Sequence, residues 1–119
     1  SAIREILDIT FDAYLESDEI KASDVEPLEQ VIDHLTETIR LNHIDRLQRG
    51  ECTIQNGFVL ADMLGNYERV SDHCSNIAVT ILELGSGTFD SHEFLSNIKT
   101  MDNPDFRDKF NAFMKKYEI

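Results

Sequence analysis

Residues 66–78 of this chain read NYERVSDHCSNIA and lie within a long run of helical periodicity. The polar residues of this stretch are ordered as well: Glu68, Asp72 and Asn76 follow one another at intervals of four, so they line one side of a helix. Two like charges at this spacing weaken a bare helix by a few tenths of a kcal/mol, whereas a cation shared by Glu68 and Asp72 would make the pair stabilising. A solvated acidic face is the simpler explanation of one such pair, and a second pair would favour a cation site.

The periodicity continues outside this stretch and predicts an all-α fold. Helices are expected at about residues 3–17, 23–49, 53–84, 91–100 and from 103 onward. Ser23 and Glu26 form a capping-box signature for the second helix, and Gly50 suits its C-terminus. The two long helices are joined by a short turn, so they must pack antiparallel. The third helix is expected to bury a stripe made of Leu60, Met63, Tyr67, Val70, Cys74, Ile77, Ala78 and Ile81.

The composition describes one acidic domain. At 119 residues the chain can bury a single core, and its 5 Gly and 2 Pro are few turn-forming residues for a many-stranded fold. The formal net charge of −12 disfavours nucleic acid and anionic lipid surfaces and favours cations, basic partners or solubility alone. No apolar run approaches the ~20 residues that span a bilayer, and no signal peptide is visible. Cys52 and Cys74 do not make a disulfide framework, which suits a reduced cytoplasmic setting.

A second acidic pair, Glu29 and Asp33, repeats the spacing on the preceding helix. When the hairpin is folded at Gly50, Asp33 comes level with Glu68 and Glu29 comes level with Asp72. A rotation of about 100° per residue places all four carboxylates on one face of the hairpin, away from the core. Without Lys or Arg partners they would repel one another, and hard cations bound through oxygen would remove that repulsion. This geometry leaves both metal binding and a solvated acidic face open.

Other chemistries find less support. A buried di-iron site needs Glu-x-x-His on inward faces, and no acid here is followed by His three residues later. The histidines lack the spacing of a zinc site, although His73 lies beside Asp72 and is a candidate ligand of a metal there. No Gly-rich phosphate loop and no nucleophile with a neighbouring base can be identified, so we expect no enzymatic activity.

The acidic helix resembles the PhoU family of phosphate-homeostasis proteins. The family signature reads roughly E-R-x-x-D-x-x-x-N-I-A, and here residues 68–78 read ERVSDHCSNIA. The preceding acidic motif of the family, E-x-x-V/I-D, matches EQVID at residues 29–33. Two sequence segments, SDHCSNIA at 71–78 and LQRGECT at 47–53, are similar to the PhoU-like domain at the C-terminus of bacterial sodium/phosphate cotransporter proteins. The tail from residue 90 to 117 is similar to the end of those transporters.

The resemblance covers roughly residues 3 to 117 as one domain, and Ser1-Ala2 reads as a remnant of tag removal. It implies an antiparallel three-helix PhoU bundle with two short C-terminal helices. It also implies that Glu29, Asp33, Glu68 and Asp72 correspond to the two E(D)xxxD motifs that bind metal clusters in PhoU proteins. Iron and zinc are the metals associated with the family, as a multinuclear cluster. Candidates for additional ligands are Asn76 and His73.

The resemblance further implies a regulatory function in phosphate uptake. The expected place is the cytoplasmic side of the cell membrane, within a larger membrane protein, with the transporter's membrane domain as partner and no lipid insertion by these residues. A full PhoU protein has two bundles and this chain has one, so a homodimer is a second expected assembly. The alternative is a metal-free helical adaptor that binds a protein partner through its acidic face.

Overall fold

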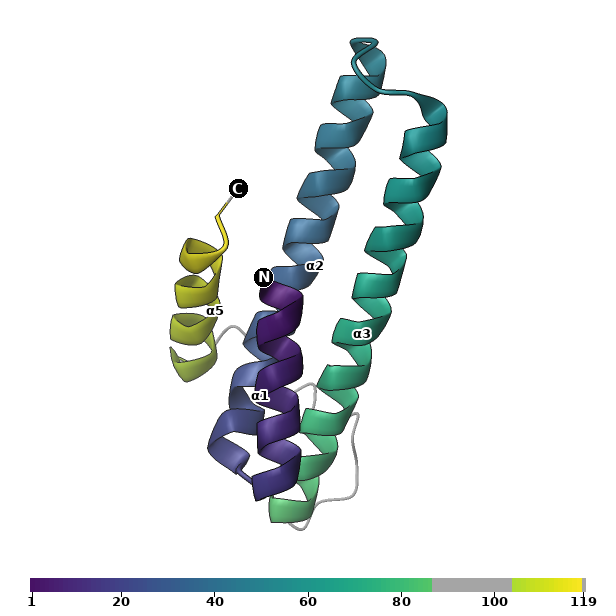
Figure 1. Ribbon diagram of the computed structural model, residues 1–119. Helices are drawn as coiled ribbons and strands as arrows, with labels where there is room; N and C mark the ends of the chain where they lie inside the picture. Colours follow the sequence, from purple (N-terminus) through teal and green to yellow (C-terminus); the bar gives the residue numbers. More distant parts are fainter. Residues whose placement is uncertain (87–103, 119) are drawn as a thin grey trace.

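The computed structural model describes residues 1–86 and 104–118 (Figure 1). The helices are α1 (Ala2–Glu16), α2 (Glu19–Gln48), α3 (Ile54–Ser86) and α5 (Pro104–Lys116). The described residues contain no strand, so the all-α prediction is confirmed. The helix predicted at 91–100 and residue 103, where the last helix was expected to begin, lie outside the described residues. Long helices α2 and α3 form an antiparallel hairpin, α1 packs along the half of it distant from the turn, and α5 lies against α2 (Figure 1).

The start of α2 differs from the prediction. Asp18 is the N-cap, and its Oδ1 accepts hydrogen bonds from the backbone N–H groups of Ile20 and Lys21 at 3.0 and 3.2 Å. The predicted capping box is wrong, because Ser23 lies inside the helix and its Oγ donates to the carbonyl of Ile20 at 2.6 Å. Only two residues, 17 and 18, therefore separate the end of α1 from the start of α2. Asp and Ser are about equally favourable N-cap residues, and the helix begins at Asp18, which comes earlier in the chain than Ser23.

Pro27 lies in the interior of α2 rather than in its first turn. A proline there removes one helical hydrogen bond and costs about 3 kcal/mol relative to Ala. Its ring is fully buried, which recovers part of that cost. The sequence rule that places Pro at a helix start is overridden here by tertiary packing.

The hairpin turn follows the prediction closely. Gly50 adopts a left-handed conformation with φ of 74°, which is accessible to glycine at little cost. Thr53 then starts the next helix, since its Oγ1 accepts from the N–H of Asn56 at 3.2 Å. Ser75 donates to Glu26 across the hairpin at 2.5 Å, and these two positions are equidistant from the turn at 50–51. The antiparallel register inferred from the turn is therefore correct.

The core lies where α1, α2 and α3 meet. It is formed by buried Ala2, Ile6, Ala13, Ala22, Val25, Leu28, Ile32, Cys74 and Ala78. Burial raises the pKa of the Cys74 thiol, and both cysteines are free.

The predicted stripe of α3 is only partly buried, and this is a correction. Cys74 and Ala78 are buried, but Met63, Tyr67 and Ile77 are 46%, 41% and 41% exposed. For Met63 and Tyr67 the reason is length: α1 has 15 residues whereas α2 and α3 have 30 and 33, so α1 cannot cover the whole hairpin. Ile77 lies beside α1, where it lines a hollow together with Tyr14.

The helix α5 is attached by its apolar face and by charged contacts. Phe106 is buried, and Lys109 Nζ lies 2.9 Å from Asp24 Oδ1 on α2. At the other end of α5, Lys116 Nζ lies 2.9 Å from Glu5 Oε1 on α1, and the Tyr117 hydroxyl donates to the same carboxylate. None of the described helices combines the length and hydropathy needed for a membrane span.

Candidate metal centre

Three of the four predicted acidic ligands converge on one face of the hairpin. Glu29, Asp33 and Asp72 each offer a carboxylate oxygen, and these oxygens lie within 4.8 Å of one another. The cause is the pairing of a spacing of four on α2 with the antiparallel register, which sets Glu29 level with Asp72. Asp33 and Asp72 are exposed.

Glu29 is more buried than its position around the axis of the helix predicted. Its exposed fraction is 4%, so the expectation that all four carboxylates point away from the core is wrong for this residue. Gln30 Nε2 donates to its Oε2 at 3.3 Å, and another oxygen of the acidic group, from Asp72 of α3, lies within 4.8 Å. Burying a carboxylate is costly unless hydrogen bonds or a cation compensate it. Glu29 is therefore the one member of the acidic group whose carboxylate lies largely out of water, since Asp33 and Asp72 are exposed.

Glu68, the fourth predicted ligand, lies outside this group. Its Oε1 is 2.6 Å from Nη1 of Arg40, which lies further along α2 toward the turn. The expectation that the four carboxylates have no basic partner is wrong for Glu68. The two side chains are 39% and 33% exposed, so the ion pair is partly solvated. A pair of this kind contributes about 1 kcal/mol or less.

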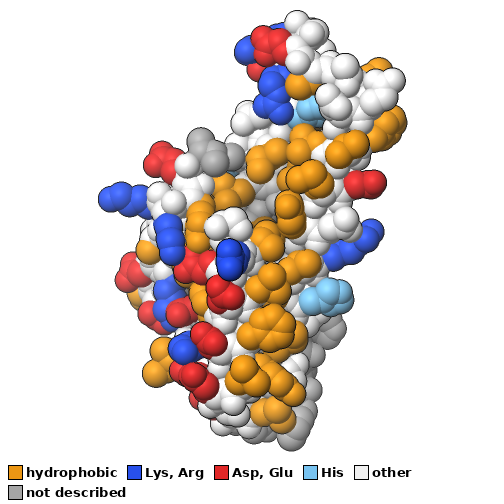
Figure 2. All heavy atoms as spheres, viewed as in Figure 1, with side chains coloured by type: hydrophobic (Ala, Val, Ile, Leu, Met, Phe, Trp, Pro, Cys, Tyr) orange, Lys and Arg blue, Asp and Glu red, His pale blue; other side chains and the backbone are white. Residues whose placement is uncertain are grey.

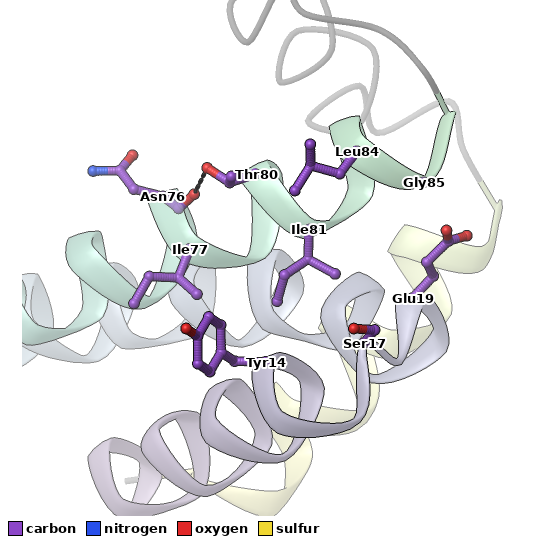
Figure 3. Close-up of a pocket in the computed structure, with 9 residues that line it drawn as sticks. All are labelled: Tyr14, Ser17, Glu19, Asn76, Ile77, Thr80, Ile81, Leu84 and Gly85. Atoms are coloured by element: carbon purple, nitrogen blue, oxygen red, sulfur yellow. Dashed lines mark hydrogen bonds between the residues drawn. The ribbon is translucent and has the colours of Figure 1, made fainter.

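Of the two additional candidates, His73 does not belong to the group of Glu29, Asp33 and Asp72. His73 follows Asp72 directly and is exposed. Asn76 lines a hollow between α1 and α3, shown in Figure 3, where Thr80 Oγ1 donates to its backbone carbonyl at 2.9 Å. Asn76 as a further ligand stays a prediction.

A buried polar layer below the acidic group was missed by the sequence reasoning. Glu26 is 3% exposed and Ser75 is 7% exposed, and they share the hydrogen bond across the hairpin. Gln30 Nε2 donates to Glu26 at 3.4 Å as well as to Glu29, and so connects the layer to the acidic group. The hairpin register could have revealed it, because Glu26 precedes Glu29 by three residues and Ser75 follows Asp72 by three.

The comparisons with known proteins identify one family. The PhoU domain family model matches residues 1–81, which include α1, α2 and most of α3. All four predicted acidic ligands lie inside the matched range. No curated protein and no solved structure matches the chain.

Proposed function

Since residues 1–81 match the PhoU domain, this chain belongs to the PhoU family, and we propose that it is a regulatory domain of phosphate homeostasis rather than an enzyme. In this proposal it binds a metal ion through Glu29, Asp33 and Asp72 and regulates a sodium-dependent phosphate transporter. The convergence of the three carboxylates within 4.8 Å is the observation that supports metal binding.

The donor set fits one hard cation. Carboxylate oxygens bind zinc at about 2.0–2.2 Å and calcium at about 2.3–2.6 Å, so ligands on opposite sides of an ion lie about 4–5 Å apart. The separation of up to 4.8 Å in this group agrees with that range. Oxygen ligands favour hard cations, while the family resemblance points to iron or zinc. A multinuclear cluster would need further ligands, for which Glu68, His73 and Asn76 are the candidates.

A bound ion would tie the two long helices together. Glu29 and Asp33 belong to α2 and Asp72 belongs to α3, so an ion held by all three offsets their mutual repulsion and links the helices. We propose that this link changes how the hairpin packs against its partner.

The partner in this proposal is the membrane domain of the same protein, on the cytoplasmic side of the cell membrane. The support is the similarity of residues 47–53, 71–78 and 90–117 to PhoU-like domains of sodium/phosphate cotransporters. The metal-free adaptor is the competing hypothesis, and it uses the same acidic face.

Metal binding is tested with the triple variant Glu29→Gln, Asp33→Asn, Asp72→Asn. Bound metals are measured by plasma mass spectrometry, and metal-free protein is titrated calorimetrically with Zn²⁺, Mn²⁺ and, without oxygen, Fe²⁺. We expect the wild type to bind at least one ion per chain and the triple variant to bind none. The control is Asp62→Asn, which removes an exposed carboxylate of α3 outside the group and should leave binding unchanged.

Thermal melts supply a second measurement. A metal that binds only the folded state must raise the melting temperature of the wild type but not that of the triple variant. A wild type that stays empty with every metal and shows no shift overturns metal binding and favours the adaptor. A triple variant that binds as tightly as the wild type shows that these residues are not the ligands.

Regulation is tested separately by sodium-dependent phosphate uptake in cells whose transporter carries this domain. We expect the triple variant to change uptake while the amount of transporter in the membrane stays the same. If uptake is unchanged although the purified variant has lost its metal, the regulatory part of the proposal is wrong.

A further inference from the structure

The free end of the long hairpin lies beyond the other described helices, at the top of Figure 1. We call residues 40–61 the tip, since they are the parts of α2 and α3 nearest the turn at Gly50. None of the 22 residues of the tip is buried. Six large apolar side chains are exposed there: Leu41, Ile44, Leu47, Ile54, Phe58 and Val59.

The polarity of the tip is inverted relative to the core. Its inward positions hold polar or small residues: a Cβ added at Gly57 would lie 2.7 Å from Nε2 of His43, and Arg46 Nε donates to Cys52 Sγ at 3.4 Å. These four residues are half-buried, whereas the large apolar residues of the tip face water. Exposed apolar side chains that gather in one place mark an interaction site for a protein or a membrane.

The exposed apolar side chains face more than one side of the tip. Phe58 and Val59 are 71% and 60% exposed, and consecutive side chains of a helix point about 100° apart. On α2, Leu41 and Ile44 are 57% and 50% exposed. A protein partner covers one side of such a hairpin, whereas the boundary region of a bilayer can contact several sides at once. The distribution therefore favours a lipid surface.

The tip also lacks the negative charge of the rest of the chain. It contains three Arg and only two acidic residues, so its formal net charge is +1 and the remaining 97 residues carry −13. On the face shown in Figure 2, most of the acidic side chains lie away from the tip. The net charge of −12 disfavours anionic lipid for the chain as a whole, but it does not describe the free end of the hairpin.

Distance separates the tip from that negative charge. Outside the tip, the acidic residues nearest the turn are Glu37 and Asp62, about 20 and 17 Å from it along their helices. The Debye length at physiological ionic strength is about 8 Å, so these charges are screened from a surface at the turn. The molecule measures 54 × 26 × 23 Å, and the tip is one end of its long dimension. The tip can therefore meet a membrane while the acidic part is turned away.

We propose that the tip binds the interface of a lipid bilayer, with its apolar side chains at the boundary between headgroups and acyl chains. Interfacial segments reach about 5–10 Å into this region, and Ile44, Leu47 and Ile54 lie within about 9 Å of the turn along their helices. Arg46 and Arg49 lie at the same level, where Arg side chains are attracted to lipid phosphates.

This contact replaces, for the tip, the expectation of no lipid insertion. It uses no residue of the acidic group, so it does not depend on metal binding.

The first test is flotation of the full 119-residue chain with vesicles of phosphatidylcholine and phosphatidylglycerol. A chelator is present, so that metal cannot bridge the acidic group to lipid phosphates. We expect the wild type to float with the vesicles, at high salt as well, because salt does not screen apolar contacts. The Ile44→Ser, Phe58→Ser variant should bind about tenfold more weakly or less, since it loses two inserted apolar side chains.

The matched control is Phe11→Ser, Tyr14→Ser, which removes two apolar side chains of α1 that are 60% and 64% exposed. This variant should float like the wild type. Both double variants replace exposed side chains, so their helical circular dichroism should match that of the wild type.

The second test locates the contact. The chain contains no Trp, so Phe58→Trp introduces a single fluorophore at the tip and Phe11→Trp introduces one on α1. On vesicles, the emission of Phe58→Trp should shift to shorter wavelength and be quenched by lipids with brominated acyl chains. Phe11→Trp should show neither change.

A chain that does not float overturns the proposal and leaves the tip to a protein partner. So does an Ile44→Ser, Phe58→Ser variant that floats as well as the wild type. A Phe11→Trp emission that responds to the lipid as strongly as that of Phe58→Trp also contradicts it, because the contact would then not be at the tip.

Discussion

The guanidinium of Arg40 holds Glu68 away from the acidic group: Nη1 of Arg40 lies 2.6 Å from Oε1 of Glu68. Arg40 is seven residues beyond Asp33, about 10 Å further along α2, whereas Glu68 is level with Asp33 in the hairpin register. The long side chains of both residues bridge that difference. Because the ion pair is partly exposed, it is weak enough for a cation to compete with Arg40 for this carboxylate.

The first prediction concerns this competition. Replacing Arg40 by Gln frees Glu68 and removes a positive charge near the acidic group, so metal affinity should rise about fivefold, the equivalent of about 1 kcal/mol. Calorimetric titration with Mn²⁺ and Zn²⁺ measures the change. Arg49→Gln is the control, because Arg49 pairs with Asp45 at the tip of the hairpin. Equal affinities in the wild type and Arg40→Gln would show that Glu68 has no part in binding.

The second prediction contrasts two buried serines of α3. Ser75→Ala removes the donor that Glu26 accepts from, and a buried acceptor that loses a partner costs about 1–3 kcal/mol of unfolding free energy. Ser71 is fully buried too, but its Oγ has no hydrogen-bond partner among the described residues. Ser71→Ala should therefore leave stability unchanged or raise it slightly. Urea unfolding measures the free energy of unfolding of both variants. If both lose the same amount of it, the assigned hydrogen bond between Ser75 and Glu26 is wrong.

The third prediction concerns two glycines. A Cβ added at Gly65, in the middle of α3, would meet no atom within 4 Å, so Gly65→Ala should stabilise the protein by about 1 kcal/mol and raise Tm by about 4 °C. Gly50→Ala should instead destabilise by about 1 kcal/mol, because φ there is 74°. Thermal melts by circular dichroism compare the two. A loss of stability in Gly65→Ala would mean that this position requires glycine for a reason other than space.

The fourth prediction concerns the attachment of α5 at low pH. Partial burial raises the pKa of Glu5, but hydrogen bonds from Tyr117 and Lys116 outweigh it and bring the pKa below its ordinary value of 4.5. A carboxyl with a lowered folded-state pKa contributes stability above its unfolded pKa and loses it as the pH falls. Hydrogen exchange of the α5 amides, corrected for intrinsic rates, should therefore show protection that declines below about pH 4.5.

Glu5→Gln is the control for that experiment. The glutamine of this variant cannot ionise. Its α5 amides should therefore be less protected from exchange than those of the wild type at neutral pH, and their protection should fall little further in acid. If the wild type and Glu5→Gln respond to acid in the same way, another carboxyl controls the attachment of α5.

For the described residues, the local sequence was sufficient for the helices, apart from the start of α2, and for the pairing of the long ones. Helical periodicity and the glycine at position 50 predict a hairpin, and its short turn leaves one antiparallel register. That register alone places Glu29 level with Asp72, and the structure brings their carboxylates together. These features depend on residues close in sequence or on a single turn, so few alternatives compete with them.

The tertiary structure decided which faces are buried and which charges meet. The short α1 leaves Met63 and Tyr67 exposed although they lie on a continuous apolar stripe, because burial depends on the length of the covering helix. Glu29 is buried although its place on the helix predicted an outward direction, and the ion pair with Arg40 holds Glu68 outside the acidic group. A helical wheel gives the direction of a side chain from its own axis. It does not contain the neighbouring helices or the length of a flexible arginine, and these decided the composition of the site.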